Sequence, residues 1–167
     1  KWIYDIYDAQ NNVTGFVPHT APFYGGGGGP GWGCACIIIP WLLYKFYGDR
    51  QVLEEHYDSM KQWIRYLGTC TNDKGIVTRE EPGSWFLGDW CTPSGWKNIK
   101  ISAELVGSFY YAYVTNLMSE ISDVLGKKAD QLYYMQIFKK IGENFNKSFF
   151  NAVKDSYSCV VEGSNVF

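Results

Sequence analysis

Apolar side chains recur at intervals of three and four residues in the middle of the chain, over residues 50–68. This spacing places them on one face of an α-helix, and the positions are Leu53, His56, Tyr57, Met60, Trp63, Ile64 and Leu67. Asp49 stands just before the segment and suits the N-cap of a helix. Gly68 suits its end, so the pattern predicts one amphipathic helix here.

The second half of the chain carries two more helical patterns. Residues 103–125 follow Ser102, a good N-cap, and stop at Gly126; the predicted buried face holds Leu105, Phe109, Tyr113, Leu117, Ile121 and Val124. Residues 129–148 form the next predicted helix, whose buried face holds Leu132, Tyr133, Phe138, Ile141 and Phe145. We also expect a helix that ends near residue 10, and one over residues 33–47 that Pro40 kinks or restarts.

The remaining segments are long loops rich in glycine and tryptophan, over residues 11–33 and 69–100. Strand-like alternation occurs only at residues 76–78 and in the last dozen residues, so the predicted class is mainly α. Paired helices joined alternately by short turns and long loops are typical of an α/α hairpin array. In such an array the long loops gather at one end, where a binding site can form.

Composition narrows the function classes. The 167 residues have a net charge of −2 and a hydrophobic content of 46%, which excludes a disordered chain and a broad basic face for nucleic acid. No run of about 18 apolar residues occurs, so we expect no membrane span. Aromatic residues reach 18%, so the chain has either a very aromatic core or aromatics kept for a ligand.

The five cysteines are odd in number and fit no disulfide framework. Cys34 and Cys36 lack the second thiol or histidine pair that would complete a zinc site, so we expect buried free thiols and no metal. The glycine run at residues 25–29 has neither a preceding strand nor a following Lys-Ser or Lys-Thr pair, which argues against a phosphate loop. The sequence therefore predicts no cofactor.

Trp32 is the first candidate for ligand contact. It stands between Gly31 and Gly33 in a predicted loop, where its ring has room for a flat ligand such as the apolar face of a sugar. Contact with a ligand and local packing are equally compatible with this position.

The second candidate cluster runs from Trp85 to Trp90 and holds one carboxylate, Asp89, among aromatic residues. A carboxylate in apolar surroundings needs hydrogen bonds, or its pKa rises, and either state is useful in a sugar site. The alternative is that Asp89 caps a turn or pairs with Arg79 or Lys97.

Other groups near these loops have simpler interpretations. Glu80 and Glu81 are interpreted as a solvated pair, and Glu104 lies in the first turn of a predicted helix, where the helix dipole favours negative charge. The chain has only two histidines, and no Ser-His-Asp or Cys-His arrangement can be argued from them.

Several short motifs, taken in order, resemble the catalytic domain of bacterial α-L-rhamnosidases of glycoside hydrolase family 78. They are Asp-Ala-Gln at residues 8–10, Pro-Gly-Trp-Gly-Cys-Ala at 30–35, Pro-Trp at 40–41, Tyr-Gly-Asp at 47–49, Gly-Asp-Trp at 88–90, Glu-Leu-Val at 104–106 and Leu-Gly-Lys at 125–127. Each piece is short, but the ordered set, which extends over roughly residues 1–150, is specific.

The resemblance implies an (α/α)6 barrel about twice as long as this chain. Residues 1–167 would then be a partial catalytic domain, truncated at both ends, that holds roughly half of the barrel and three of its six hairpins. The family removes terminal α-L-rhamnose with inversion, which needs an acid and a base roughly 6.5–9.5 Å apart. In the family the acid lies upstream of this chain's start and the base downstream of its end, so we expect the catalytic residues outside it.

What the resemblance leaves to this chain is the wall that binds the sugar. The implied substrate-binding residues are Trp32, Cys34, Trp85, Asp89, Trp90 and Glu104. The family usually has Asp where this chain has Cys34, and a thiol cannot accept two strong hydrogen bonds from sugar hydroxyls. If the family Asp contacts the sugar, this protein binds a different sugar, binds its sugar weakly, or has lost activity. If the family Asp instead caps the helix, the change costs only about 1 kcal/mol of stability.

The implied partners are a rhamnose-containing oligosaccharide and the remainder of the same domain. The substrate class favours a periplasmic or extracellular location, whereas five cysteines without a pairing pattern argue mildly against an oxidising space. One alternative is a non-catalytic carbohydrate-binding α/α protein, which Cys34 favours. Another is a structural helical module whose aromatic side chains all lie in its core.

Overall fold

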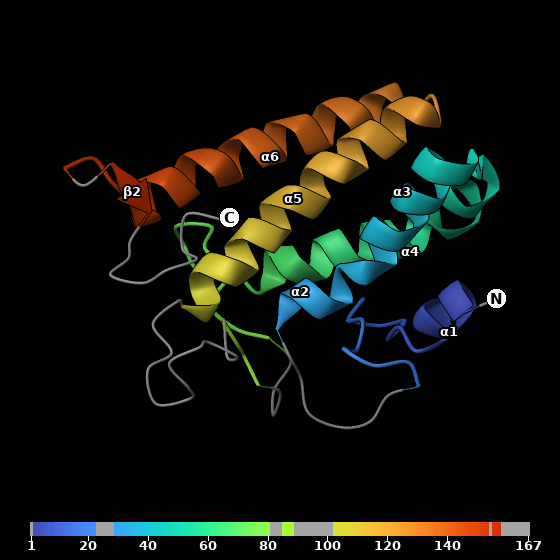
Figure 1. The fold of residues 1–167 in the computed structure, drawn as a ribbon, viewed down its shortest axis with the longest axis horizontal. Coiled ribbons are helices and arrows are strands. Elements are labelled where there is room, and N and C mark those ends of the chain that lie inside the picture. Colours follow the sequence, from blue (N-terminus) through green and yellow to red (C-terminus); the bar gives the residue numbers. More distant parts are fainter. Residues whose placement is uncertain (1, 23–28, 81–84, 89–101, 154, 158–167) are drawn as a thin grey trace.

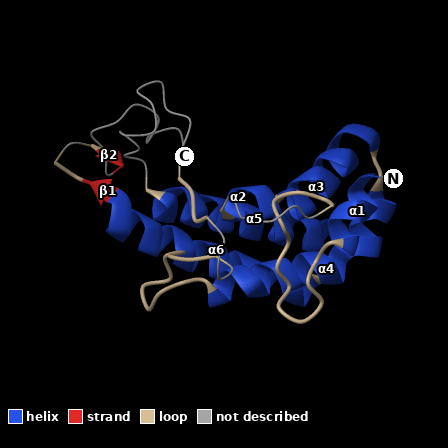
Figure 2. Cartoon of the chain, turned by 90° about the horizontal axis from the view of Figure 1, so that it is seen from below, coloured by secondary structure: helices blue, strands red, loops and turns tan. Residues whose placement is uncertain are grey.

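The computed structural model describes residues 2–22, 29–80, 85–88, 102–153 and 155–157. The elements are α1 (Trp2–Asp8), α2 (Pro30–Gly33), α3 (Ala35–Tyr47), α4 (Arg50–Thr69), α5 (Ala103–Val124), α6 (Lys128–Phe149), β1 (Phe150–Asn151) and β2 (Ser156–Tyr157). Figure 2 shows how small the strand content is, with both strands at one end of α6. The predicted mainly helical class is confirmed.

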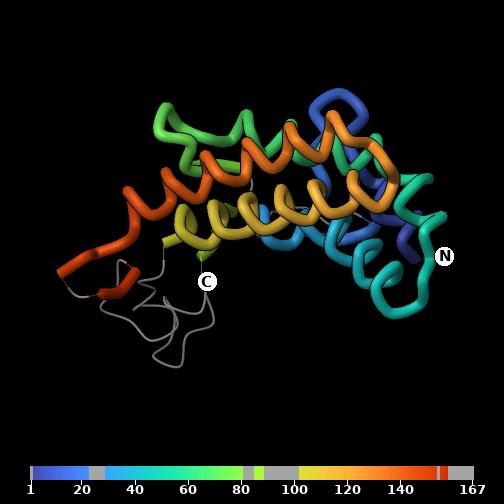
Figure 3. Tube along the Cα trace, turned by 90° about the horizontal axis from the view of Figure 1, so that it is seen from above, coloured from blue at the N-terminus to red at the C-terminus, as the bar shows by residue number. Residues whose placement is uncertain are grey.

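The helices form two hairpins, α3 with α4 and α5 with α6, while α1 packs against α3 (Figure 1). The described residues thus hold two full pairs, the single helix α1 and the short helix α2, and the expected partial domain with three of six hairpins stays a prediction. Helix α5 contacts α2, α3, α4 and α6, and Figure 3 shows it running between α6 and α2. It is the central element of this part of the protein.

Both predicted N-caps are present. The Asp49 side chain accepts a hydrogen bond from the Val52 backbone N–H at 3.2 Å, and the Ser102 hydroxyl accepts one from that of Leu105 at 3.1 Å. Pro40 lies within α3, which continues through it without restarting.

The predicted buried face of α4 is confirmed, because every position in it is less than 9% exposed. The face predicted for α5 is only partly right. Tyr113 is 37% exposed, while Tyr111, Val114 and Met118, which lie off the predicted stripe, are buried. Helix α5 has neighbours on several sides, so more than one stripe of its surface is covered.

The face predicted for α6 is wrong at Leu132, Tyr133 and Phe138, which are 55%, 57% and 37% exposed. Its buried residues are Tyr134, Ile141, Phe145 and Phe149. Helix α6 packs mainly along α5, so it buries a narrower stripe than its apolar content permits.

The regions expected to form strands hold only short pairings. Val77 forms an isolated antiparallel bridge with Thr71, and β1 pairs antiparallel with β2, with Phe150 opposite Tyr157. Cys34, Cys36 and Cys70 are buried free thiols, as predicted, and the other two cysteines lie outside the described residues. No helix among the described residues is long and apolar enough to cross a membrane.

Candidate functional site

Three segments that are distant in sequence meet at one end of the helices. They are α2, the first turns of α5 and residues 85–88, which lie near one another in Figure 1. Gly107 on α5 marks the meeting point, because a Cβ there would lie 3.4 Å from the Phe86 ring and 3.5 Å from the Pro30 ring. The absence of a side chain at Gly107 thus lets α2 and residues 85–88 approach α5 closely.

Trp32 occupies a single helical turn, α2, rather than the loop predicted for it. Its indole is 44% exposed. The reason lies in its neighbours, since a Cβ on Gly33 would lie 2.4 Å from the Trp63 ring and one on Gly31 would lie 2.9 Å from the Tyr110 ring. The two glycines face packed side chains, and the large residue between them is directed outward.

Two hollows flank Trp32, and both Trp32 and Ala35 line each of them. One, of about 380 Å³, lies toward α1 and is also lined by Trp2, Ile6, Val17, Pro18, His19, Thr20 and Ala21. The other, of about 360 Å³, lies toward α5 and is also lined by Gly31, Ile38, Ile39 and Tyr110. Largely apolar walls with a few polar groups are typical of ligand pockets.

Cys34 lies in the core rather than on this surface, with 0% of it exposed. The Trp63 Nε1–H donates a hydrogen bond to its sulfur at 3.4 Å. Burial raises the pKa of the Cys34 thiol to about 12, and the nearby Glu80 acts in the same direction. Full burial of this thiol disfavours the predicted sugar contact.

Cys34 does not act as a side-chain cap either. It occupies the N-cap position of α3, but its side chain accepts no capping hydrogen bond. Its backbone carbonyl accepts from the N–H groups of Ile37 and Ile38, as helical geometry requires. Packing against Trp63 is therefore the role that the structure assigns to this residue.

Glu80 is buried, with 7% exposed, so its interpretation as part of a solvated pair is wrong. Its carboxylate accepts a hydrogen bond from the backbone N–H of Gly29 at 2.9 Å. Gly29 immediately precedes α2, so Glu80 holds the start of the turn that presents Trp32. Sequence reasoning missed this residue, because its partner lies 51 positions away. Glu81 lies outside the described residues.

Of the other predicted site residues, the structure describes Trp85 and Glu104 but not Asp89 and Trp90. Trp85 is 64% exposed, and the following turn reaches Gly29, whose Cβ would lie 3.0 Å from the Leu87 carbonyl oxygen. Glu104 is exposed in the first turn of α5, as predicted. Asp89 and Trp90 lie outside the described residues. The fold therefore brings the segments that carry Trp32, Trp85 and Glu104 to one end of the helices. Among the residues that the structure describes, no group of three side chains that could hold a metal ion occurs.

The described residues form α/α hairpins, and the exposed Trp32 and Trp85 lie on segments near the first turns of α5. Residues 1–166 match the bacterial alpha-L-rhamnosidase 6 hairpin glycosidase domain, and the chain belongs to this family. Both the predicted family and the predicted relation to the (α/α)6 fold are confirmed.

Two alpha-L-rhamnosidases are similar in sequence to most of this chain. An alpha-L-rhamnosidase of Formosa agariphila is 30% identical over 162 residues, which are 93% of this chain and 17% of the relative. An alpha-L-rhamnosidase of Streptomyces avermitilis is 32% identical over 151 residues, 89% of this chain and 13% of the relative. The chain thus spans less than a fifth of these relatives.

Solved structures show the same relation. The alpha-L-rhamnosidase from Dictyoglumus thermophilum superimposes with a TM-score of 0.79 at 36% identity, over 90% of this chain and 16% of that one. The Streptomyces avermitilis alpha-L-rhamnosidase complexed with L-rhamnose gives a TM-score of 0.72 at 30% identity, over 90% of this chain and 14% of that one.

Proposed function

We propose that the protein containing this chain removes terminal α-L-rhamnose from oligosaccharides or glycosides with inversion, and that this segment supplies part of the sugar-binding wall. The observation that carries the proposal is the exposed indole of Trp32 between two hollows, in a chain of the alpha-L-rhamnosidase family. The solved relative that is complexed with L-rhamnose supports the substrate class.

The chemistry of the wall agrees with a 6-deoxy sugar. Rhamnose has a methyl group where most hexoses have a hydroxymethyl group, so one end of its ring is apolar. The hollow toward α5 offers Ile38, Ile39 and the Trp32 ring to such a group. Burying a methyl group there stabilises the complex by about 0.8 kcal/mol.

The acid and base of the reaction are proposed to lie outside this chain. Inversion needs one carboxyl group on each side of the glycosidic bond, roughly 6.5–9.5 Å apart. Among the described residues of this end, Glu104 is an exposed carboxylate on a helix, and Glu80 is buried and bonded to a backbone N–H. Glu80 therefore serves to position Trp32, and Trp85, Asp89, Trp90 and Glu104 stay proposed contacts of the sugar.

The remainder of the domain is the second proposed partner. Leu132, Met135 and Phe138 leave an apolar strip exposed along α6. Exposed apolar strips of this kind mark surfaces that pack against other protein.

The rival functions find less support. A non-catalytic carbohydrate-binding protein was favoured by Cys34, but the thiol packs against Trp63 in the core, so its identity bears on packing. A purely structural module requires aromatic side chains to lie in the core, whereas Trp2, Trp32 and Trp85 are 59%, 44% and 64% exposed.

The proposal is tested with the full-length protein and an aryl α-L-rhamnoside. We expect hydrolysis, with β-L-rhamnose as the first product detected by NMR. Trp32→Ala should raise KM about tenfold, and Phe46→Ala, at a site that is 76% exposed and away from both hollows, should leave KM unchanged. Binding of L-rhamnose without hydrolysis would favour the carbohydrate-binding alternative, and absence of both would overturn the proposal.

A further inference from the structure

The hollow toward α5 has few polar side chains in its walls. Among the described residues that line it, only Trp32 and Tyr110 carry a polar atom in the side chain; the others are Gly31, Ala35, Ile38 and Ile39. Its volume of about 360 Å³ lies within the range of ligand pockets, roughly 300–1,000 Å³. Any selection that the described part of this hollow makes by side-chain hydrogen bonds therefore comes from those two residues.

Close packing holds the Tyr110 ring in place. A Cβ on Gly31 would lie 2.9 Å from its Cε2 atom and 3.0 Å from its Cδ2 atom, so the edge of the ring lies against the backbone of α2. The ring carbon that bears the hydroxyl, Cζ, would lie 3.4 Å from the same Cβ, next to the residue that presents the Trp32 indole. The Phe109 ring meets the Tyr110 ring edge to face, with ring centres 5.5 Å apart. A hydroxyl on a ring fixed in this way is already positioned for a ligand.

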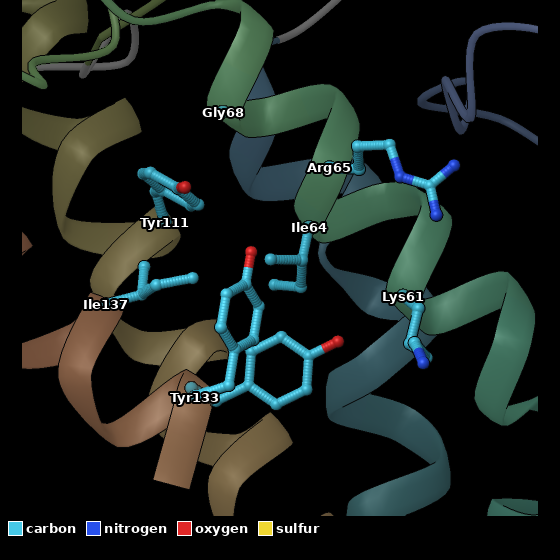
Figure 4. Close-up of a pocket in the computed structure, with 8 residues that line it drawn as sticks. Lys61, Ile64, Arg65, Gly68, Tyr111, Tyr133 and Ile137 are labelled. Carbon is cyan, nitrogen blue, oxygen red and sulfur yellow. The ribbon is translucent and has the colours of Figure 1, made fainter. Parts of the chain in front are cut away.

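The neighbouring residue, Tyr111, lines a different hollow. That hollow, of about 330 Å³, lies between α4, α5 and α6 (Figure 4). Gly107 stands three residues before Tyr110, on the same side of α5, and approaches the Pro30 ring of α2. Consecutive residues of a helix point to different sides, so Tyr110 is directed toward α2 while Tyr111 is directed toward α4 and α6.

The shape of rhamnose selects one of its hydroxyls for this position, an inference that rests on the proposed function. The methyl group of rhamnose is attached to C5 of the ring, and the nearest ring hydroxyl is the one on C4. When the methyl group packs on Ile38 and Ile39, the C4 hydroxyl enters the same hollow, which Tyr110 also lines.

We propose that Tyr110 is a specificity-determining residue, whose phenol forms a hydrogen bond with the C4 hydroxyl of the rhamnosyl unit. A phenol can both donate and accept, so it suits a sugar hydroxyl in either sense. A sugar that lacks this hydroxyl, or that carries it on the opposite face of the ring, would leave the phenol without this bond.

The experiment compares three p-nitrophenyl glycosides on the full-length protein: the α-L-rhamnoside, its 4-deoxy analogue and its 2-deoxy analogue. Tyr110→Phe removes only the phenol oxygen and keeps the packed ring. For the rhamnoside and the 2-deoxy analogue we expect kcat/KM to fall about fivefold, as for the loss of one neutral hydrogen bond. For the 4-deoxy analogue, which lacks the proposed partner, wild type and variant should differ by less than about twofold.

Tyr113→Phe is the matched control on the same helix. Its ring also contacts Phe109, with ring centres 6.1 Å apart, but Tyr113 borders neither hollow beside Trp32. The same loss of a phenol oxygen at this site should leave kcat/KM unchanged for all three glycosides.

A loss of equal size on all three glycosides would assign Tyr110 a purely structural role, and no loss on any would remove it from the site. Either result overturns this inference while hydrolysis of the rhamnoside by the wild type upholds the proposed function. A wild-type protein that cleaves none of the three glycosides overturns the proposed function and this inference with it.

Discussion

The Tyr7 hydroxyl donates a hydrogen bond to the backbone carbonyl of Cys36, at 2.5 Å. Cys36 lies four residues before Pro40 in α3, and proline has no N–H to offer that carbonyl. Helix α1 thus supplies the donor that the sequence of α3 lacks. The Tyr7 ring also stacks on His56 of α4, with ring centres 3.9 Å apart, so one side chain joins three helices.

Tyr7→Phe tests this relationship. The substitution leaves a carbonyl in the protein interior without a partner, so we expect the free energy of unfolding to fall by about 1–3 kcal/mol in urea titrations. Tyr4→Phe is the matched control, because the Tyr4 hydroxyl bonds to Glu55 at an exposed site, and its effect should be much smaller.

A double-mutant cycle separates this hydrogen bond from the ring stacking. Pro40→Ala restores an N–H in α3, so Tyr7→Phe should destabilise the Pro40→Ala protein less than the wild type. An equal cost in both backgrounds would contradict the proposed link between Pro40 and Tyr7.

Glu80→Ala removes the acceptor of the Gly29 N–H, and we expect a loss of about 1.5–3 kcal/mol of stability together with a severalfold rise in KM for an aryl α-L-rhamnoside. Glu80→Gln keeps an acceptor oxygen and should restore much of both quantities. Unfolding curves and steady-state kinetics on the full-length protein measure them. Glu143→Gln on the exposed side of α6 serves as control, and a KM unchanged in Glu80→Ala would show that Glu80 does not position Trp32.

Gly33→Ala places a methyl group 2.4 Å from the Trp63 ring and 2.9 Å from the Val17 carbonyl oxygen. Overpacking of this kind costs about 1–3 kcal/mol, and displacement of α2 should also raise KM. Gly142→Ala in α6 has open space around it and should instead stabilise the protein by about 0.5–1 kcal/mol. Thermal unfolding of the two variants compares them directly, and shifts of the same sign would count against this account.

Burial raises the pKa of the Cys34 thiol from its ordinary value of 9.0 to about 12, so the folded state favours the protonated thiol. The stability from this preference is complete below pH 9 and is lost as the pH rises toward 12. Alkylation by iodoacetamide, followed by peptide mass spectrometry, should leave Cys34 unmodified in the native protein at pH 8 and modify it in urea. Rapid modification of the native protein would show that the thiol is accessible.

Local signals in the sequence predicted the features that depend on local structure. Asp49 and Ser102 cap their helices through side-chain bonds to residues three positions ahead, so their neighbours in sequence suffice to identify them. The buried face of α4 also followed from its period, because the helix has one strongly apolar side.

Features set by distant neighbours could not be read in this way. Tyr113 is exposed and Tyr111 buried because of the helices around α5, which the period of α5 does not encode. Glu80 is fixed by Gly29 from another segment, and Cys34 by Trp63 of α4. At Trp32 the flanking glycines indicated exposure correctly, but not the helical turn that produces it.

The order Gly31, Trp32, Gly33 also limits how this surface can evolve. Pro30 is buried, and a side chain larger than that of glycine at position 31 or 33 would clash with the Tyr110 or Trp63 ring, so position 32 is the most exposed place in α2 at which side-chain size can change. Given the proposed contact between Trp32 and the sugar, variants that accept a different sugar should arise by exchange of Trp32, or by changes in the walls opposite it. A library that randomises positions 32, 38 and 39 would change the side chains that line the hollow toward α5 and would leave Gly31 and Tyr110 unchanged.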